Sequence, residues 1–235
     1  MAVKPGDPAA IEQLFNDVAP RYDRLNDLLS LGLHRQWKRQ LLVWLQPKPG
    51  ERWLDLCCGT GDLALSLARL VRPSGDVVGL DAAAAPLALA EERRALEPWL
   101  KVDWLHADAM DTGLASASFD GLVMAYGLRN LADAAAGFEE MRRLLRPGAR
   151  AGVLDFNRLP QASWPAAFQR QYLRRIVVPA AALAGLEPQY AYLEESLKRF
   201  ATGAEQEAMA LDAGFRTARH RPLMAGQMGM LLLEA

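Results

Sequence analysis

Three aspartates follow short apolar runs, and their order along the chain suits one class of ligand. Asp55, Asp81 and Asp108 each stand at or just after the end of a strand-like segment. Parallel strands bring their carboxyl ends to one edge of a sheet, where open α/β folds bind ligands. One acid there could face an amino group, one a ribose diol and one an adenine amine. The pattern therefore predicts a site for S-adenosylmethionine, which carries all three groups.

A Gly-x-Gly turn joins the first of these segments to a helical pattern that opens at Asp62. The turn consists of Gly59, Thr60 and Gly61. Glycines let the backbone approach a ligand closely, and a helix start offers N–H groups and a positive dipole end. We expect the turn and Asp55 to hold the methionine end of the methyl donor. The alternative is a plain strand-to-helix turn capped by Asp62.

The other two acids predict contacts to the nucleoside. Asp81, followed by Ala82, would accept two hydrogen bonds from the ribose hydroxyls, unless it only caps the next helix. Asp108 with Ala109 would address the adenine through a carboxylate and a backbone N–H, and Met110 would pack on the ring. A simple loop aspartate is the alternative for Asp108.

The glycine turn also fits a dinucleotide pattern, so an NAD-dependent oxidoreductase is a competing interpretation. Residues 59–64 satisfy G-x-G-x-x-A. Asp55, however, would lie close to the pyrophosphate and repel it, and Asp108 has no regular role in NAD binding. Little chain also remains for a separate catalytic domain. A non-catalytic module that binds the methyl donor is a further alternative, which the sequence does not exclude.

Composition restricts the class of protein. The 235 residues are 51% apolar and carry a net charge of −1, so we expect a buried sheet and no nucleic-acid partner. The two cysteines, Cys57 and Cys58, are adjacent and give neither a disulfide framework nor a metal spacing. The N-terminus does not resemble a signal peptide, and the apolar run 176–186 is shorter than the ~20 residues of a spanning helix. We expect a cytoplasmic protein without a metal.

Alternating strand and helix patterns predict a doubly wound parallel sheet from residue 51 onward. Expected strands are 51–57, 76–81, 101–106, 119–125 and 149–156, with helices at 62–72, 84–95 and 133–145. A helix near 203–213 and strand-like runs at 215–222 and 227–234 follow. These patterns predict a seven-stranded sheet with an antiparallel C-terminal edge strand, and the glycine turn fits the class I S-adenosylmethionine-dependent methyltransferase fold.

We divide the chain into four parts. They are an N-terminal helical lid (1–50), the donor-binding core (51–157), a helical insertion (158–200) and a C-terminal helix and hairpin (201–235). Tyr22 would belong to the lid over the cofactor, unless it packs in the core. The charge run that begins at His34 and includes Lys38 is interpreted mainly as a solvated helix face.

Two motifs resemble signatures of the UbiE/MenG quinone C-methyltransferase family. They are Phe15-x-x-Val18-Ala19-x-Arg21-Tyr22-Asp23-x-Leu25-Asn26-Asp27 and Tyr126-Gly127-Leu128-Arg129-Asn130-Leu131-x-Asp133. Segments 56–62, 174–179 and 190–196 are similar to the branch that makes phylloquinone in cyanobacteria and plastids. The chain departs from the wider family at Cys57-Cys58 and at Ala125, where some relatives place a serine near the cofactor. Ala125 can therefore contribute no hydroxyl contact.

The resemblance implies methylation of 2-phytyl-1,4-naphthoquinone, in its quinol form, at the ring carbon beside the tail. A menaquinone or ubiquinone precursor with another tail is the alternative, because tails are distinguished by the shape of a channel. The ring must lose a proton, so the enzyme must stabilise a phenolate-like oxygen or supply a base. We expect Arg129 to do this by hydrogen-bonding the oxygen or orienting a water, with Asn130, Tyr126 and Asp155 as secondary candidates. The alternative for Arg129 is a structural ion pair with Asp133.

The lipophilic tail implies that substrate comes from a bilayer. Aromatic and arginine side chains interleave along the insertion at Trp164, Phe168, Tyr172 and Arg174. Such a stripe could line a tail channel and contact anionic lipid peripherally, although core packing is the ordinary explanation. The insertion could equally form a homodimer contact.

Overall fold

The computed structural model describes residues 12, 13, 16, 32–158, 171, 175 and 196–235. Tyr22 and most of the insertion, including its aromatic stripe, lie outside the described residues. The division into a lid and an insertion therefore stays a prediction. Within the described ranges no helix is long and apolar enough to cross a membrane.

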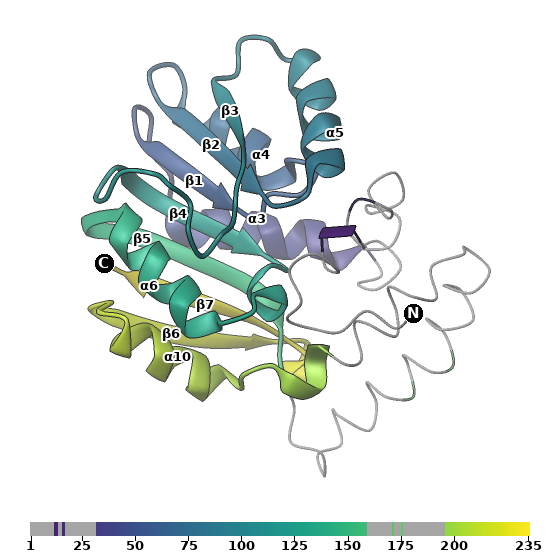
Figure 1. The fold of residues 1–235 in the computed structure, drawn as a ribbon, viewed down its shortest axis with the longest axis vertical. Helices are drawn as coiled ribbons and strands as arrows, with labels where there is room; N and C mark the ends of the chain where they lie inside the picture. Colours follow the sequence, from purple (N-terminus) through teal and green to yellow (C-terminus); the bar gives the residue numbers. More distant parts are fainter. Residues whose placement is uncertain (1–11, 14–15, 17–31, 159–170, 172–174, 176–195) are drawn as a thin grey trace.

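A single seven-stranded sheet forms the centre of the molecule, with the order β3-β2-β1-β4-β5-β7-β6 (Figure 1). The strands are β1 (Arg52–Leu56), β2 (Asp76–Asp81), β3 (Val102–His106), β4 (Phe119–Ala125), β5 (Leu145–Phe156), β6 (Thr217–Leu223) and β7 (Met228–Glu234). Strands β1 to β5 are parallel, and the order reverses between β1 and β4. The doubly wound, seven-stranded fold predicted from the sequence is confirmed.

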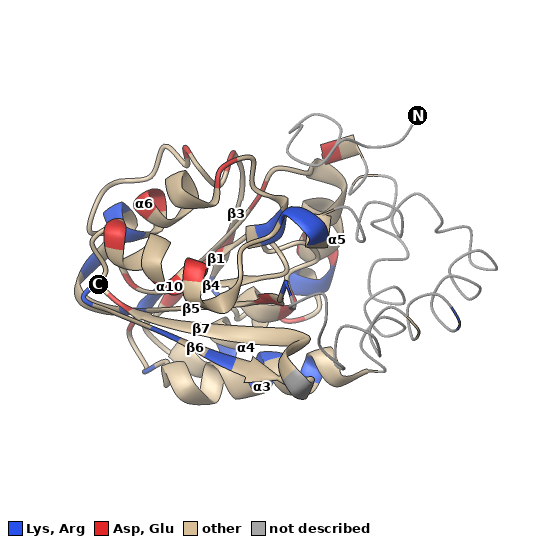
Figure 2. Ribbon diagram, turned by 90° about the horizontal axis from the view of Figure 1, so that it is seen from below, with Lys and Arg blue, Asp and Glu red and all other residues tan. Residues whose placement is uncertain are grey.

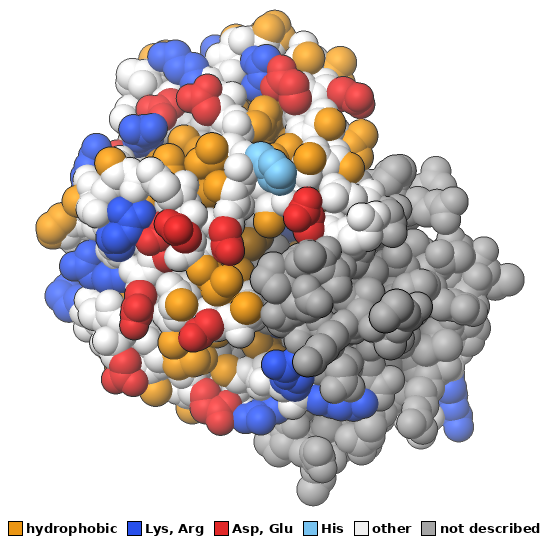
Figure 3. All heavy atoms as spheres, in the orientation of Figure 1, with side chains coloured by type: hydrophobic (Ala, Val, Ile, Leu, Met, Phe, Trp, Pro, Cys, Tyr) orange, Lys and Arg blue, Asp and Glu red, His pale blue; other side chains and the backbone are white. Residues whose placement is uncertain are grey.

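Helices cover both faces of the sheet (Figures 1 and 2). They are α3 (Leu33–Leu45), α4 (Asp62–Val71), α5 (Ala84–Ala95), α6 (Ala134–Leu144) and α10 (Gly203–Asp212), with short 3-10 turns η2 (Leu128–Asn130) and η4 (Met224–Gly226). One buried cluster joins the sheet to α3 and α4 through Leu41 and Leu67. The other joins it to α6 and α10 through Phe138 and Ala210. Basic and acidic side chains are interspersed over the described part of the face in Figure 3.

The C-terminal hairpin completes the sheet with antiparallel pairing. Strand β7 pairs with both β5 and β6, so the last strand lies one position inside the edge and β6 forms the edge itself. Burial explains this order, because β7 is apolar and mostly buried whereas no residue of β6 is buried. Arg219, Arg221 and Pro222 suit an edge strand, where charges and a missing N–H are tolerated.

Trp104 on β3 packs into the space left by two glycines. A Cβ atom added to Gly79 would lie 2.3 Å from the Trp104 ring, and one added to Gly61 would lie 2.7 Å from it. Gly79 is on the neighbouring strand β2, whereas Gly61 precedes α4. The indole therefore sets the distance between the sheet and the glycine turn.

We predict that Gly79→Ala destabilises the protein by about 1–3 kcal/mol, because the added methyl overlaps the indole. Denaturant unfolding of the variant measures this loss. The double variant Gly79→Ala/Trp104→Leu should recover part of the stability relative to the sum of the single changes. Additive effects of the two substitutions would show that the overlap is relieved elsewhere.

Candidate active site

A cavity of about 520 Å³ opens at the carboxyl ends of β1, β2, β3 and β4. It lies where the strand order reverses, which is the usual ligand site of a doubly wound sheet. The predicted site residues that line it are Gly59, Asp81, Ala82, Asp108, Ala109, Met110, Ala125, Tyr126 and Asn130. Four loops that are distant in sequence, those after β1, β2, β3 and β4, are therefore brought together as the sequence predicted.

Asp81 at the end of β2 connects the glycine turn to the start of α5. Its Oδ2 accepts a hydrogen bond from Gly59 N at 2.8 Å, and its Oδ1 accepts one from Ala83 N at 2.9 Å. Burial raises the pKa of this carboxyl, and the two backbone donors act in the opposite direction. A carboxylate has about four acceptor positions, so Asp81 can accept further hydrogen bonds from a diol in the cavity.

Asp108 shapes the loop after β3. Its Oδ1 accepts a hydrogen bond from Met110 N at 2.8 Å, and its side chain is exposed at the cavity. Ala109 is buried beneath this turn. His106 Nε2 lies 2.7 Å from the carbonyl oxygen of Ala82, which ties β3 to the loop after β2. The loop after β3 thus places the Asp108 carboxylate, backbone groups and the Met110 thioether within a single turn of the cavity wall.

Asp55 is buried beneath the glycine turn, with 1% of its surface exposed. Its Oδ2 accepts a hydrogen bond from Ala64 N, in the first turn of α4, at 2.8 Å. It lines a second, small cavity of about 20 Å³ together with Gly59, Thr60 and Ala125. Burial raises the pKa of Asp55 from 3.8 to about 7, although the nearby Lys38 ammonium acts in the opposite direction. The site therefore favours a cationic group beside Asp55.

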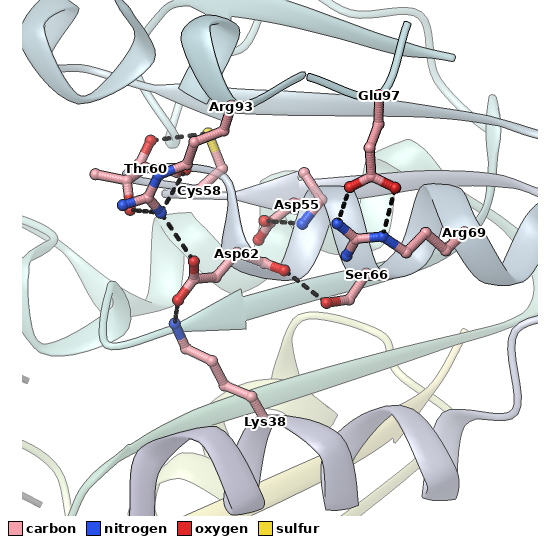
Figure 4. A network of polar contacts seen from close by, with 11 residues as sticks. Lys38, Asp55, Cys58, Thr60, Asp62, Ser66, Arg69, Arg93 and Glu97 are labelled. Carbon is pink, nitrogen blue, oxygen red and sulfur yellow. Dashed lines mark hydrogen bonds and ion pairs between the residues drawn. The ribbon is translucent and has the colours of Figure 1, made fainter. Parts of the chain in front are cut away.

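A polar network clamps the glycine turn from two helices (Figure 4). Asp62 Oδ2 lies 3.2 Å from Lys38 Nζ of α3, and Asp62 Oδ1 lies 3.0 Å from Arg93 Nη1 of α5. Arg93 also donates to Thr60 Oγ1 at 2.9 Å. Asp62 is not the N-cap proposed as an alternative, because Gly61 occupies that position and Asp55 supplies the carboxylate. Gly61 is not among the residues that line either cavity.

The interpretation of the charge run on α3 as a solvated face is wrong for two of its residues. His34 is 2% exposed and the Lys38 side chain 14% exposed, whereas Arg35 and Arg39 are exposed. The helical phase explains the difference, since positions 34, 38, 41 and 45 form one stripe. Reading that stripe would have identified Lys38, which the sequence analysis did not place in the site.

Two non-glycine residues with positive φ form the rim between the cavities. Cys57 has φ 59° after β1, and Tyr126 has φ 64° after β4. Such backbone is strained for side chains other than glycine. A Cβ on Gly127 would lie 2.7 Å from Cys57 Cβ, so the two turns approach closely. Part of the backbone strain of the described residues therefore lies where two loops of the cavity wall pack closely.

Arg129 lies behind the cavity wall, in a buried ion pair with Asp155 of β5. Its Nη1 is 2.6 Å from Asp155 Oδ1 and also donates to the carbonyl oxygen of Tyr126 at 2.9 Å. The proposed partner Asp133 instead caps α6 by accepting from Ala135 N and Ala136 N. Arg129 does not line the 520 Å³ cavity; it lines a neighbouring hollow of about 530 Å³.

Leu131 and Ala132 line both hollows. Asn130 reaches the first hollow and donates from Nδ2 to the carbonyl oxygen of Tyr126 at 2.9 Å. Arg129 and Asn130 therefore meet at one carbonyl but face two adjoining spaces. Within the described residues, no group of three His, Cys, Asp or Glu side chains is placed to hold a metal ion.

Comparisons with known proteins agree with this geometry. The model of the ubiE/COQ5 methyltransferase family matches residues 4–231. The chain is 47% identical to a 2-phytyl-1,4-naphthoquinone methyltransferase of Synechococcus elongatus, over 97% of this chain and 98% of the relative. It is 43% identical to the chloroplastic 2-phytyl-1,4-β-naphthoquinone methyltransferase of Arabidopsis thaliana, over 93% of this chain and 85% of the relative.

Solved structures show the same fold at much lower sequence identity. A SAM-dependent methyltransferase from Aquifex aeolicus superposes with a TM-score of 0.64 at 17% identity. The match covers 90% of this chain and 97% of the other chain. The predicted fold class is therefore confirmed by structure as well as by sequence.

We predict that stability of the ligand-free protein falls between about pH 4 and pH 7 because of Asp55. Its folded pKa lies above its unfolded pKa, so the folded state binds an extra proton that is lost as pH rises through this window. Asp55→Asn keeps an acceptor for Ala64 N and removes the titration. As pH rises, the free energy of unfolding of the variant should therefore increase relative to that of the wild type, by up to about 1.4 kcal/mol per pH unit.

Denaturant unfolding from pH 5 to pH 8 measures this difference. Asp103→Asn, at an exposed position on β3, is the matched control for loss of one carboxyl. A difference between wild type and Asp55→Asn that stays constant with pH would contradict the raised pKa.

Proposed function

This chain belongs to the ubiE/COQ5 methyltransferase family, and we propose which of its residues bind the methyl donor and which promote methyl transfer to a phytyl-naphthoquinol. The enzyme is an S-adenosylmethionine-dependent quinone methyltransferase that acts in phylloquinone synthesis. The observation that carries this conclusion is the similarity to phytyl-naphthoquinone methyltransferases over nearly the whole chain. Family membership sets aside the NAD-dependent oxidoreductase that the glycine turn alone allowed.

The donor site fits the described cavities. A volume of about 520 Å³ is typical of ligand pockets. Asp108, Ala109 and Met110 would hold the adenine over β3, and Asp81 with Ala82 would hold the ribose over β2. Gly59, Thr60 and Asp55 would hold the amino-acid end over β1, which follows the order of strands along the sheet edge. Tyr22 would cover the donor from residues outside those described.

S-adenosylmethionine, when bound, supplies a methyl group activated on a sulfonium. The chain would hold the quinol ring carbon in line with this methyl group, and the proton that the methyl group replaces on the ring would pass to a water molecule oriented by Arg129. A quinol is nucleophilic at carbon when its hydroxyl loses or shares a proton. The chain must therefore orient the ring and stabilise negative charge on its oxygen.

Arg129, Asn130 and Tyr126 are the groups we assign to this step. The Arg129 guanidinium stays protonated, so it acts as a hydrogen-bond donor or orients a water, and not as a base. Asp155 and the Tyr126 carbonyl fix the direction of the guanidinium. The quinol ring would lie at Leu131 and Ala132, where the two hollows adjoin, with Asn130 on the donor side.

Three expectations about partners stay predictions. The phytyl tail implies contact with a bilayer at the time of substrate transfer, through the insertion or the charged face of α3. A homodimer contact through the insertion is the other use of that segment. We also expect the reaction to need no metal, because the donor sulfonium already activates the methyl group.

We predict that the protein transfers labelled methyl from S-adenosylmethionine to demethylphylloquinone only when a quinone reductant is present. The reduced ring is the nucleophile, so the oxidised quinone should give no product. Product analysis by mass spectrometry measures the transfer. Donor binding without methylation of any quinol would leave the fold assignment intact and overturn the substrate.

We predict that Arg129→Met lowers kcat by about a hundredfold or more while the donor Kd changes little. The substitution also leaves Asp155 without its ion pair, which should cost about 3–5 kcal/mol of stability. The double variant Arg129→Met/Asp155→Asn removes that buried charge and should regain much of the stability. If the double variant also regains kcat, Arg129 supports the reaction only by stabilising the folded structure and has no direct role in methyl transfer.

A further inference from the structure

Lys38 is a largely buried lysine, with 14% of its side chain exposed, that the assignments above do not use. It lies on the stripe of α3 that carries His34, Leu41 and Leu45, all of them buried. Lysine is seldom buried unless its ammonium is paired or has a function. Lys38 Nζ lies 3.2 Å from Asp62 Oδ2 and 6.0 Å from the centroid of the Tyr126 ring.

The Lys38 side chain lines the small cavity at the glycine turn. The other lining residues include Asp55, Gly59, Thr60 and Asp62, and among the described residues Lys38 is the one basic side chain on this cavity. The cavity of about 20 Å³ has room for the end of a ligand and not for a whole one. It shares Cys57, Gly59 and Ala125 with the 520 Å³ cavity, so a ligand bound in the larger space can present one end to Lys38.

The charges around Lys38 are arranged for a zwitterionic group. Asp62 divides its carboxylate between Lys38 and Arg93 (Figure 4), so it neutralises the Lys38 ammonium only in part. Asp55 stands on the same cavity as a buried acid whose partner from the protein is a backbone N–H. One wall thus offers a cation and an acid to the same small space.

We propose that Lys38 binds the α-carboxylate of S-adenosylmethionine while Asp55 binds its α-amino group. This inference rests on the proposed function, because it assumes the methyl donor as the ligand. Lys38 would fix the amino-acid end from the α3 side, opposite the nucleoside contacts of Asp81 and Asp108. The competing explanation is that Lys38 only fastens α3 to α4 through Asp62.

The test compares two ligands in three proteins by isothermal titration calorimetry. The ligands are S-adenosylmethionine and decarboxylated S-adenosylmethionine, and the proteins are the wild type, Lys38→Met and Arg39→Met. Arg39 is exposed on the same helix and is the matched control for loss of a positive charge. The ratio of the two Kd values within each protein isolates the interaction with the carboxylate, because general effects of a substitution cancel.

We predict that the wild type prefers the complete donor by about ten- to a hundredfold, as expected for a charge-assisted hydrogen bond. Lys38→Met should reduce this preference to a few-fold, whereas Arg39→Met should keep it. Lys38→Arg should keep most of it, and this second variant provides the measurement if Lys38→Met fails to fold.

Equal weakening of both ligands by Lys38→Met, or no change in either, would overturn the proposal. The first result would show that Lys38 affects ligand binding only by positioning the glycine turn. The second would show that Lys38 has no effect on ligand binding and only stabilises the packing of α3. If the wild type binds neither ligand, the proposed function itself fails, which is distinguishable from both results.

Discussion

The placement of two carboxylates at neighbouring strand ends is the constraint on which the site depends. Asp55 lies near the end of β1 and is buried, and Asp81 ends β2 and is partly buried at the cavity. Each is held by a backbone amide at the start of the next helix, Ala64 N in α4 and Ala83 N before α5. A buried carboxylate needs such donors, and helix starts supply them together with a favourable dipole. The alternation of strand, acid and helix therefore builds the fold and the donor site at once.

These two acids differ in kind from the Arg129–Asp155 pair. Asp155 receives a full counter-charge from within the protein at 2.6 Å. Burial raises the pKa of Asp55 to about 7, because a backbone donor and a more distant ammonium offset the loss of hydration only in part. A site that leaves charge incompletely balanced gives up stability in exchange for affinity towards a ligand. The Arg129–Asp155 pair holds the cavity wall in place, and Asp55 is the acid that we propose binds the amino group of the ligand.

Local sequence patterns predicted the helices and strands correctly, but they did not predict which side chains pair with residues distant in the sequence. The strand ends at Asp55, Asp81 and Asp108 follow from apolar runs, and the structure places the last two on one cavity as expected. The partner of Arg129 is 26 residues away on another strand, so helical spacing pointed to Asp133 instead. The sequence analysis did not assign Lys38 to the site, because its charged neighbours indicated a solvent-exposed helix face. Its position along the helix, however, places it on the same face as the buried Leu41 and Leu45. Burial of β7 on both faces, visible in its unbroken apolar run, decides which strand of the hairpin lies inside.

The two ends of the segment 159–201 are tied to one another. Arg158, just after β5, pairs with Glu205 at 2.7 Å, and Glu205 also closes the capping box with Thr202 at the start of α10. When the flanks of a chain segment are fixed in this way, a change in its length has a small entropic cost, because the cost of closure grows only with the logarithm of length. The sequence between these flanks can thus diverge during evolution without disturbing the strand ends at which we propose that the donor binds. This architecture allows descendants of one methyl-transferring core to acquire new acceptors.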